Sequence, residues 1–131
     1  MQLDTVTLPS DLQWVNEFEW NQNVQSQART LSGAIEIQTA AHLYGRPIRL
    51  VGGTTGGWIT RATAKAIRAL EADPVKVMTL AGLNDEPDLA VMFDRSNGPA
   101  FESQMIMRFA NPDDTTWYSC ALRLITVEPA A

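Results

Sequence analysis

The sequence predicts an α+β fold, in which a strand-rich β-sandwich or barrel carries one flanking α-helix at about residues 60–72. Most apolar segments alternate polar and apolar residues with a period of two, which is typical of half-buried strands. A single segment has an apolar stripe of helical period, and turn signals at Asn97-Gly98 and Asn111-Pro112 separate later strands. We expect the 131 residues to form a single domain, with residues 1–11 as an extended polar arm.

The first part of the chain predicts extended segments joined by polar connections. Order begins at residues 12–15, and residues 17–20 alternate acidic and aromatic side chains, which fits a strand or an extended segment. Residues 21–29 are rich in Gln and Asn and carry few apolar side chains, so we expect a loop there. Residues 31–38 alternate and predict a half-buried strand. Residues 46–51 predict the next strand, with a proline near its start, where a missing amide hydrogen is tolerated.

The helix has clear local signals at both ends. Thr60 is the predicted N-cap, because its hydroxyl can accept a hydrogen bond from a free amide of the first turn. Asp73-Pro74 ends the helix, because the residue before a proline disfavours the helical conformation. Between them lies one apolar stripe at positions i, i+3, i+4 and i+7, formed by Thr63, Ala66, Ile67 and Leu70.

Strands are expected again after the helix. Residues 75–80 and 89–93 alternate, and so do residues 105–109, where Met105, Met107 and Phe109 share a face. The last strand is predicted to be long, over residues 117–127. Its alternation places four side chains on one face, namely Tyr118, Cys120, Leu122 and Leu124.

The composition excludes several classes of protein. The net charge of −5 and the pI of about 4.7 argue against a protein that grips nucleic acid. The one cysteine, Cys120, leaves no internal disulfide, and its apolar surroundings indicate a small buried hydrophobe. The N-terminus is not typical of a signal peptide and no run approaches 18 apolar residues. We therefore expect a chain made in a cytoplasm-like compartment, without membrane anchoring.

No catalytic motif is visible in the sequence. The one histidine, His42, has no neighbouring Cys or His that would indicate a zinc site. The glycine run at residues 52–57 lacks the lysine of a phosphate-binding loop, so anion binding there is the weaker reading. We predict no catalytic, cofactor-binding or metal-binding residues and no enzyme activity. A pocket holding His42 beside two carboxylates would favour the enzyme alternative.

Five residues are candidates for a subunit interface. Arg61, Lys65 and Arg68 form a basic stripe on the helix, either solvated or in contact with an acidic surface of a neighbouring copy or partner. Trp58 and Trp117 are the other two candidates. A chain with a basic stripe and separate acidic loops can pair head to tail and close into a ring. The acidic residues available are Glu17, Glu19, Asp85, Glu86, Asp88, Asp113 and Asp114.

Sequence patterns spread over about residues 12–127 resemble the small tail proteins of tailed bacteriophages, in the distal-tail and tail-tube group. The order of the elements resembles those folds too. The patterns are Arg29-x-Leu31-x-Gly33, Gly45-Arg46-Pro47-Ile48-x-Leu50-x-Gly52-Gly53, Trp58-Ile59-Thr60-Arg61-Ala62-Thr63, Ala66-Ile67-Arg68-Ala69-Leu70 and Leu122-Arg123-Leu124-Ile125-x-Val127.

The resemblance implies a structural protein of the virion tail, assembled in the host cytoplasm. Copies would form a ring with each other and with neighbouring tail or baseplate proteins. DNA would only pass through the channel, and an acidic lumen suits passage because it repels phosphate. Tube subunits of this family often reach a neighbour with a long β-hairpin. No such hairpin is expected here, which favours a terminal or baseplate ring over the repeating tube subunit.

A small β-rich binding module that recognises a carbohydrate or a peptide is the alternative. Its stacking faces would come from the tryptophans, which in most proteins serve packing instead. Two or more tryptophans exposed in one groove would favour this alternative. The four tryptophans are Trp14, Trp20, Trp58 and Trp117.

Overall fold

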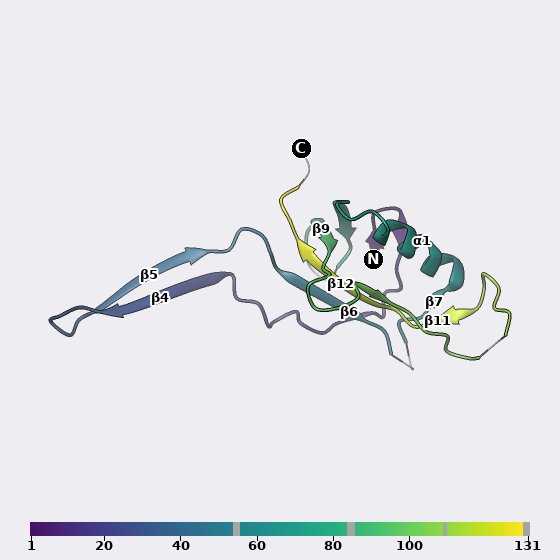
Figure 1. The fold of residues 1–131 in the computed structure, drawn as a ribbon, viewed down its shortest axis with the longest axis horizontal. Helices are drawn as coiled ribbons and strands as arrows, with labels where there is room; N and C mark the ends of the chain where they lie inside the picture. The colour runs from purple at the N-terminus through teal and green to yellow at the C-terminus, as the bar shows by residue number, and fades with distance from the viewer. Residues whose placement is uncertain (54–55, 84–85, 109, 130–131) are drawn as a thin grey trace.

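The computed structural model describes residues 1–53, 56–83, 86–108 and 110–129. It confirms the predicted fold class: the chain is rich in strands, its sheets are mainly antiparallel, and one helix lies on the flank (Figure 1). The described residues form no closed barrel. Two side chains named above, Asp85 and Phe109, lie outside the described residues.

The core is built on one antiparallel sheet with the strand order β2-β1-β8-β9-β12-β6-β3, and β10 also pairs with β12. The central strand β12 pairs with β6 on one side, and with β9 and β10 on the other. The bounds are β1 Gln2–Leu3, β2 Val6–Thr7, β3 Gln13–Trp14, β6 Pro47–Val51, β8 Met78–Ala81, β9 Leu89–Phe93, β10 Phe101–Glu102 and β12 Ala121–Thr126.

The buried face of this sheet follows the predicted alternation. Leu122 and Leu124 of β12 are fully buried and lie opposite Leu50 and Ile48 of β6 in the register. Cys120 belongs to the same buried cluster, as expected. Each fully buried leucine or isoleucine stabilises the fold by about 1.5–3 kcal/mol, so these strands hold the molecule together.

The helix α1 spans Arg61–Glu71, close to the predicted range, and ends at the C-cap Ala72. The hydroxyl of Thr60 accepts a hydrogen bond from the amide of Thr63 at 3.4 Å, which confirms the predicted N-cap. Ile67 is fully buried against the core, whereas Thr63 is half-buried. The apolar stripe thus packs on the sheet, and the basic side of the helix faces solvent.

The N-terminal residues do not form the predicted arm. β1 pairs with both β2 and β8, and Leu3, Val6 and Leu8 are buried in the core. The prediction was wrong because a few leucines and valines among polar residues give no periodic signal. Their burial depends on pairing with β8, which lies far along the chain.

Three predicted strands change their bounds. The strand expected at residues 75–80 begins only at Met78. Of the strand expected at residues 105–109, a single bridge from Met105 to Tyr118 is present among the described residues. The long last strand is split: β11 (Trp117–Tyr118) pairs with β7 (Ile59–Thr60), and β12 starts at Ala121.

The turn at Asn97-Gly98 is present, but it does not join two paired strands. β9 and β10 lie one after the other along the same edge of β12, where Phe93 pairs with Leu124 and Phe101 with Leu122. Residues 94–100 therefore leave the edge and return to it. Arg123 donates from Nη1 to the carbonyls of Asn97 and Pro99, which holds this loop against the sheet.

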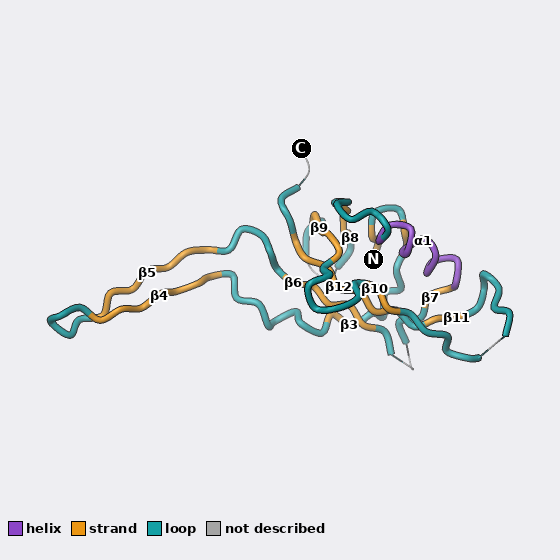
Figure 2. The backbone as a smooth tube through the Cα atoms, in the orientation of Figure 1, coloured by secondary structure: helices purple, strands orange, loops and turns teal. Residues whose placement is uncertain are grey.

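The largest departure from the sequence prediction is a long projecting hairpin. β4 (Asn23–Arg29) and β5 (Ile35–Ala41) pair over their full length and extend away from the rest of the molecule (Figures 1 and 2). Every residue in the stretch 21–41 is exposed. The expected loop at residues 21–29 and the expected absence of a long hairpin are both wrong. The strand expected at residues 31–38 exists at 35–41, with neither face buried.

Candidate functional site

The hairpin presents two different faces, because residues paired directly opposite share a face. One face carries the pairs Arg29–Ile35 and Gln27–Ile37, and so combines a positive charge with two exposed isoleucines. The other face carries Val24, Glu36 and small or polar side chains. At the tip, the turn uses Gly33 at φ +85°, a conformation that favours glycine. Leu31 of that turn is fully exposed, with a relative accessibility of 111%.

The root of the hairpin is anchored by Arg46. Its guanidinium lies 4.5 Å from the ring centroid of Trp14 and 5.7 Å from that of Trp20, which is cation–π geometry. Arg46 also donates from Nη1 to Glu86 at 3.2 Å and from Nη2 to the carbonyl of Glu17 at 2.8 Å. This single side chain thereby ties the start of β6 to residues 14–20, which precede the hairpin, and to Glu86.

Sequence reasoning missed Arg46 as an anchor. The two tryptophans lie far from it along the chain, and no local pattern places a guanidinium between them. The ring centroid of Trp20 also lies 5.3 Å from that of His42, between the two segments that form the root of the hairpin. The one available signal was an arginine next to the strand-starting Pro47, which is too common to indicate a role.

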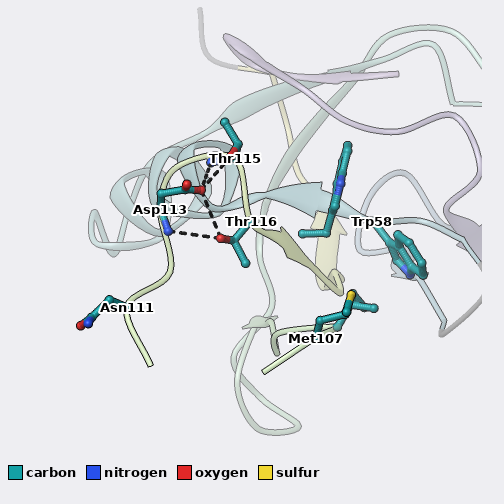
Figure 3. Close-up of a pocket in the computed structure, with 8 residues that line it drawn as sticks. Trp58, Met107, Asn111, Asp113, Thr115 and Thr116 are labelled. Carbon is teal, nitrogen blue, oxygen red and sulfur yellow. Dashed lines mark hydrogen bonds between the residues drawn. The ribbon is translucent and has the colours of Figure 1, made fainter. Parts of the chain in front are cut away.

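Two of the predicted interface residues, Trp58 and Trp117, line one pocket at the end of the molecule where β7 and β11 pair (Figure 3). The pocket has a volume of about 410 Å³. Met107 and Trp117 are both more than half exposed there. Its lining residues are Trp58, Ile106, Met107, Asn111, Asp113, Thr115, Thr116 and Trp117.

The polar wall of this pocket is a turn closed on the carboxylate of Asp113. The Oδ1 atom of Asp113 accepts hydrogen bonds from the amide and hydroxyl of Thr115, at 3.0 and 2.7 Å, and from the hydroxyl of Thr116 at 3.2 Å (Figure 3). The bonds from Thr115 are the main cause that holds the pKa of Asp113 below its ordinary value, because they favour the charged form. The pocket therefore combines apolar walls with one fixed negative charge.

The basic stripe lies beside this turn. Lys65 and Arg61 reach Asp114 of the same chain, at 3.0 and 3.7 Å. The turn also satisfies the start of the helix, since the amide of Arg61 donates to the carbonyl of Thr116 at 2.9 Å. Arg68 makes no ion pair with a described residue. Of the predicted stripe, two charges are thus used within the chain and Arg68 remains available to a partner.

The stripe lines a separate shallow pocket of about 370 Å³, together with Tyr118 and Phe101. Because Tyr118 follows Trp117 in β11, this basic pocket and the tryptophan pocket are neighbours along one strand. The five predicted interface residues therefore fall into two adjacent groups at one end of the molecule. The sequence identified the residues and could not show that they adjoin.

The remaining predicted acidic residues do not form one surface. Glu86 is bound to Arg46 at the hairpin root, and Asp114 to the helix. Glu17, Glu19 and Asp88 make no ion pair with a described residue, and Asp85 is outside the described part of the chain. The acidic partner surface expected on each copy is thus partly occupied by the chain's own cations.

His42 lines a pocket of about 490 Å³ whose wall includes the carboxylates of Glu86 and Asp88. This is the arrangement that would favour the enzyme alternative. However, Glu86 is engaged by Arg46, and the ring of His42 packs against Trp20. Within the described ranges its side chain has no hydrogen bond to either carboxylate, and no three potential metal-binding side chains gather. The absence of enzyme activity stays a prediction.

The glycine run does not open a helix, because β7 separates it from α1. Residues 54–55 lie outside the described residues. Gly52 and Gly57 approach closely, because a Cβ on Gly52 would collide with the carbonyl oxygen of Gly57. Trp58 donates from Nε1 to the carbonyl of Gly53 at 2.9 Å. The close approach of Gly52 and Gly57 and this hydrogen bond hold Trp58 at the pocket.

Two further observations concern the chain outside these pockets. Among the described residues, no helix is long and apolar enough to cross a membrane. Burial raises the pKa of the Cys120 thiol to about 12, so this buried cysteine is unreactive at neutral pH.

Comparisons of the chain with models of known protein families, with curated proteins and with solved structures find no match. The resemblance to phage tail proteins therefore stays a prediction from the sequence patterns.

Proposed function

We propose that this chain is a structural virion protein of a tailed bacteriophage, which forms a ring in the tail tip, the baseplate or the end of the tail tube around the DNA channel. The observation that carries the proposal is the projecting hairpin β4–β5, in which every residue of the stretch 21–41 is exposed. A long hairpin that reaches a neighbour is what the resemblance to tube subunits implies. Its presence removes the reason for preferring a terminal ring to a repeating tube subunit.

The physics of the hairpin supports assembly. An isolated two-stranded hairpin is marginally stable in water, and its unpaired edges invite pairing with another chain. This hairpin also exposes Val24, Leu31, Ile35 and Ile37. A surface of this kind gains most when it lies against a second molecule, because its edge hydrogen bonds and its apolar side chains are then both satisfied.

The distribution of charge supports a channel through which DNA passes without being gripped. The net charge is −5, and two of the three cations on the helix are paired with Asp114. A protein that grips DNA needs free Lys and Arg side chains facing the phosphates. The partners we propose are other copies of the chain and neighbouring tail or baseplate proteins, in the virion tail, after assembly in the host cytoplasm.

The test is the mass and shape of the purified chain in solution. Light scattering behind size exclusion, at rising protein concentration, is expected to show a closed oligomer, and negative-stain images of that peak are expected to show rings. A clean monomer at tens of micromolar that also ignores candidate tail proteins would count against the proposal. A ring would make the charge of its lumen the next quantity to measure.

A second function, recognition of a carbohydrate or a peptide, is favoured by one observation. Trp58 and Trp117 line one pocket with Asn111 and Asp113, and aromatic faces beside polar groups suit a sugar. A glycan panel with tryptophan fluorescence as the readout tests it. A saturable change that is lost in Trp117→Ala would support recognition of a sugar, and no response across the panel would count against it.

A further inference from the structure

We infer that the tip of the hairpin of one copy, with Leu31 at its apex, inserts into the pocket between Trp58 and Trp117 of a second copy. This inference rests on the proposed self-assembly and names the contact that would carry it. The two surfaces complement each other in polarity and in charge, and they lie where one chain cannot join them.

The tip of the hairpin presents an exposed apolar side chain with a positive charge beside it. Leu31 is exposed over its whole side chain, and the next pair down the ribbon sets Ile35 opposite Arg29 on one face. Arg29 uses Nη1 to donate to the carbonyl of Gly33 at 3.0 Å, which closes the turn. It forms no ion pair with any residue that the structure describes, so the rest of its guanidinium is open to a partner.

The pocket has the matching character. Its walls are the rings of Trp58 and Trp117 with Ile106 and Met107, and its volume of about 410 Å³ is ample for a leucine and part of a turn. The fixed carboxylate of Asp113 stands at its polar wall. Arg29 makes one face of the tip positive, while Glu36 lies on the opposite face, and a positive face against a negative pocket favours this pairing over contact between two pockets.

The polar atoms of the pocket distinguish an apolar occupant from a sugar. The hydroxyls of Thr115 and Thr116 both donate to Oδ1 of Asp113, so these two hydroxyl hydrogen atoms are already engaged and are not offered to a sugar oxygen (Figure 3). The exposed apolar area of Met107 and Trp117 is what stays unsatisfied. An apolar side chain removes that area from water without disrupting the turn.

The positions of the two surfaces require two copies. The hairpin projects from one end of the long axis of the molecule, and β7 and β11, which frame the pocket, lie at the other end (Figure 1). The tip of one chain therefore cannot reach its own pocket. A contact between different surfaces of identical copies is head to tail, and it repeats until it closes into a ring or extends as a filament.

Matched substitutions test the contact. Leu31→Ser is compared with Leu43→Ser, since both leucines are more than 80% exposed and only Leu31 is at the tip. Met107→Ser is compared with Val75→Ser, an exposed apolar residue outside the pocket. We expect the tip and pocket variants each to weaken self-association about ten-fold or more, and the two controls to change it less than about three-fold. Equal effects in variants and controls would overturn the inference.

Cross-linking between two single-site variants locates the contact directly. The native Cys120 is 1% exposed and so shielded from the reagent, and Leu31→Cys and Met107→Cys should be labelled only at the introduced thiols. A mixture of the two with a short bifunctional maleimide is expected to give a cross-linked dimer. Leu31→Cys alone and a mixture of Leu43→Cys with Met107→Cys are expected to give far less.

The outcomes separate this inference from the proposed function. If the unmodified chain assembles and the 31–107 cross-link does not form, the inference fails and the proposed assembly stands. If the unmodified chain stays monomeric with and without candidate tail proteins, both fail. Saturable binding of a glycan that depends on Trp117, without the cross-link, would assign the pocket to a sugar and overturn the inference.

Discussion

Removal of the hairpin separates folding from assembly in a single variant. Residues 24–40 are replaced by Asn-Gly, a dipeptide that favours the two-residue turn of a hairpin. Asn23 and Ala41 are a directly opposite pair in the ribbon, and the amide of His42 donates to the carbonyl of Gln22 at 2.6 Å. The new turn therefore joins two positions that already lie opposite each other, and the root with Arg46 is untouched.

The structure sets the expected size of the effect on stability. No residue in the removed stretch is buried, so no core contact is lost. The ribbon's own pairing is worth little in water. Shortening a loop from about 17 residues to about 2 lowers the entropy cost of closing it by about 2 kcal/mol. The free energy of unfolding should thus stay the same or rise by up to about 2 kcal/mol, with an unchanged urea m-value, because the surface buried on folding is the same.

The assay is urea unfolding followed by tryptophan fluorescence, at a protein concentration low enough that assembly adds no stability. Light scattering of the same variant at high concentration is expected to show a monomer. A second variant, in which Asn-Gly replaces only residues 30–34, keeps the ribbon and removes its tip. A loss of more than about 2 kcal/mol in the hairpin deletion, or assembly equal to that of the full chain, would refute the reasoning.

Four further outcomes follow from individual side chains. Thr60→Ala should cost about 0.5–1 kcal/mol of unfolding free energy, at the low end for an N-cap because its hydrogen bond is 3.4 Å long; a cost above 2 kcal/mol would mean another role. Arg46→Met should cost about 2 kcal/mol and speed amide exchange at the hairpin root, whereas a stable variant with a protected root would show that the guanidinium is dispensable. Cys120 should resist a thiol reagent at pH 8 until the chain unfolds. The free energy of unfolding should fall as pH rises from the ordinary thiol pKa of 9.0 towards 12, because the unfolded chain loses the thiol proton while the folded state retains it. The lowered pKa of Asp113 means that its stabilisation of the turn is present above the ordinary value of 3.8 and is lost as pH falls below it. NMR shifts of the amides in the turn should show this transition, and Asp113→Asn should abolish it.

The helix and the central strand were predictable from the sequence because their signals are local. A capping threonine, a stripe of helical period and a terminating Asp73-Pro74 lie within one short segment. The alternation of Leu122 and Leu124 predicted the buried face of β12 correctly. The N-terminal strands were missed because Leu3 is buried by a strand that lies far along the chain, which no local pattern encodes.

The hairpin was missed for a different reason. Alternation of polar and apolar residues marks a strand only when one of its faces is buried. Both faces of β4 and β5 are exposed within one chain. A polar strand without a buried face looks like a loop in sequence. If a second copy covers the ribbon, the burial of its residues arises only in the oligomer, and the pattern within one strand does not show it.

The candidate site was predictable in part. Trp58 and Trp117 were identified one at a time, and the pairing of Trp117 with Thr60 brings them together in a way that only the fold specifies. Arg61 and Lys65 were correctly placed on one side of the helix, but the prediction considered only solvent, a neighbouring copy or a partner for them, and both pair with Asp114 of their own chain.

The loop at residues 94–100 has a practical consequence. It leaves and rejoins one edge of β12 at positions opposite Leu124 and Leu122, so its ends stay about 7 Å apart whatever lies between them. Extra residues inserted there would lengthen a surface excursion at a cost that grows only slowly with length. A small fluorescent or epitope tag at this loop would leave the hairpin and the tryptophan pocket free. The tag would then serve to count the copies of the chain in the assembly that we propose.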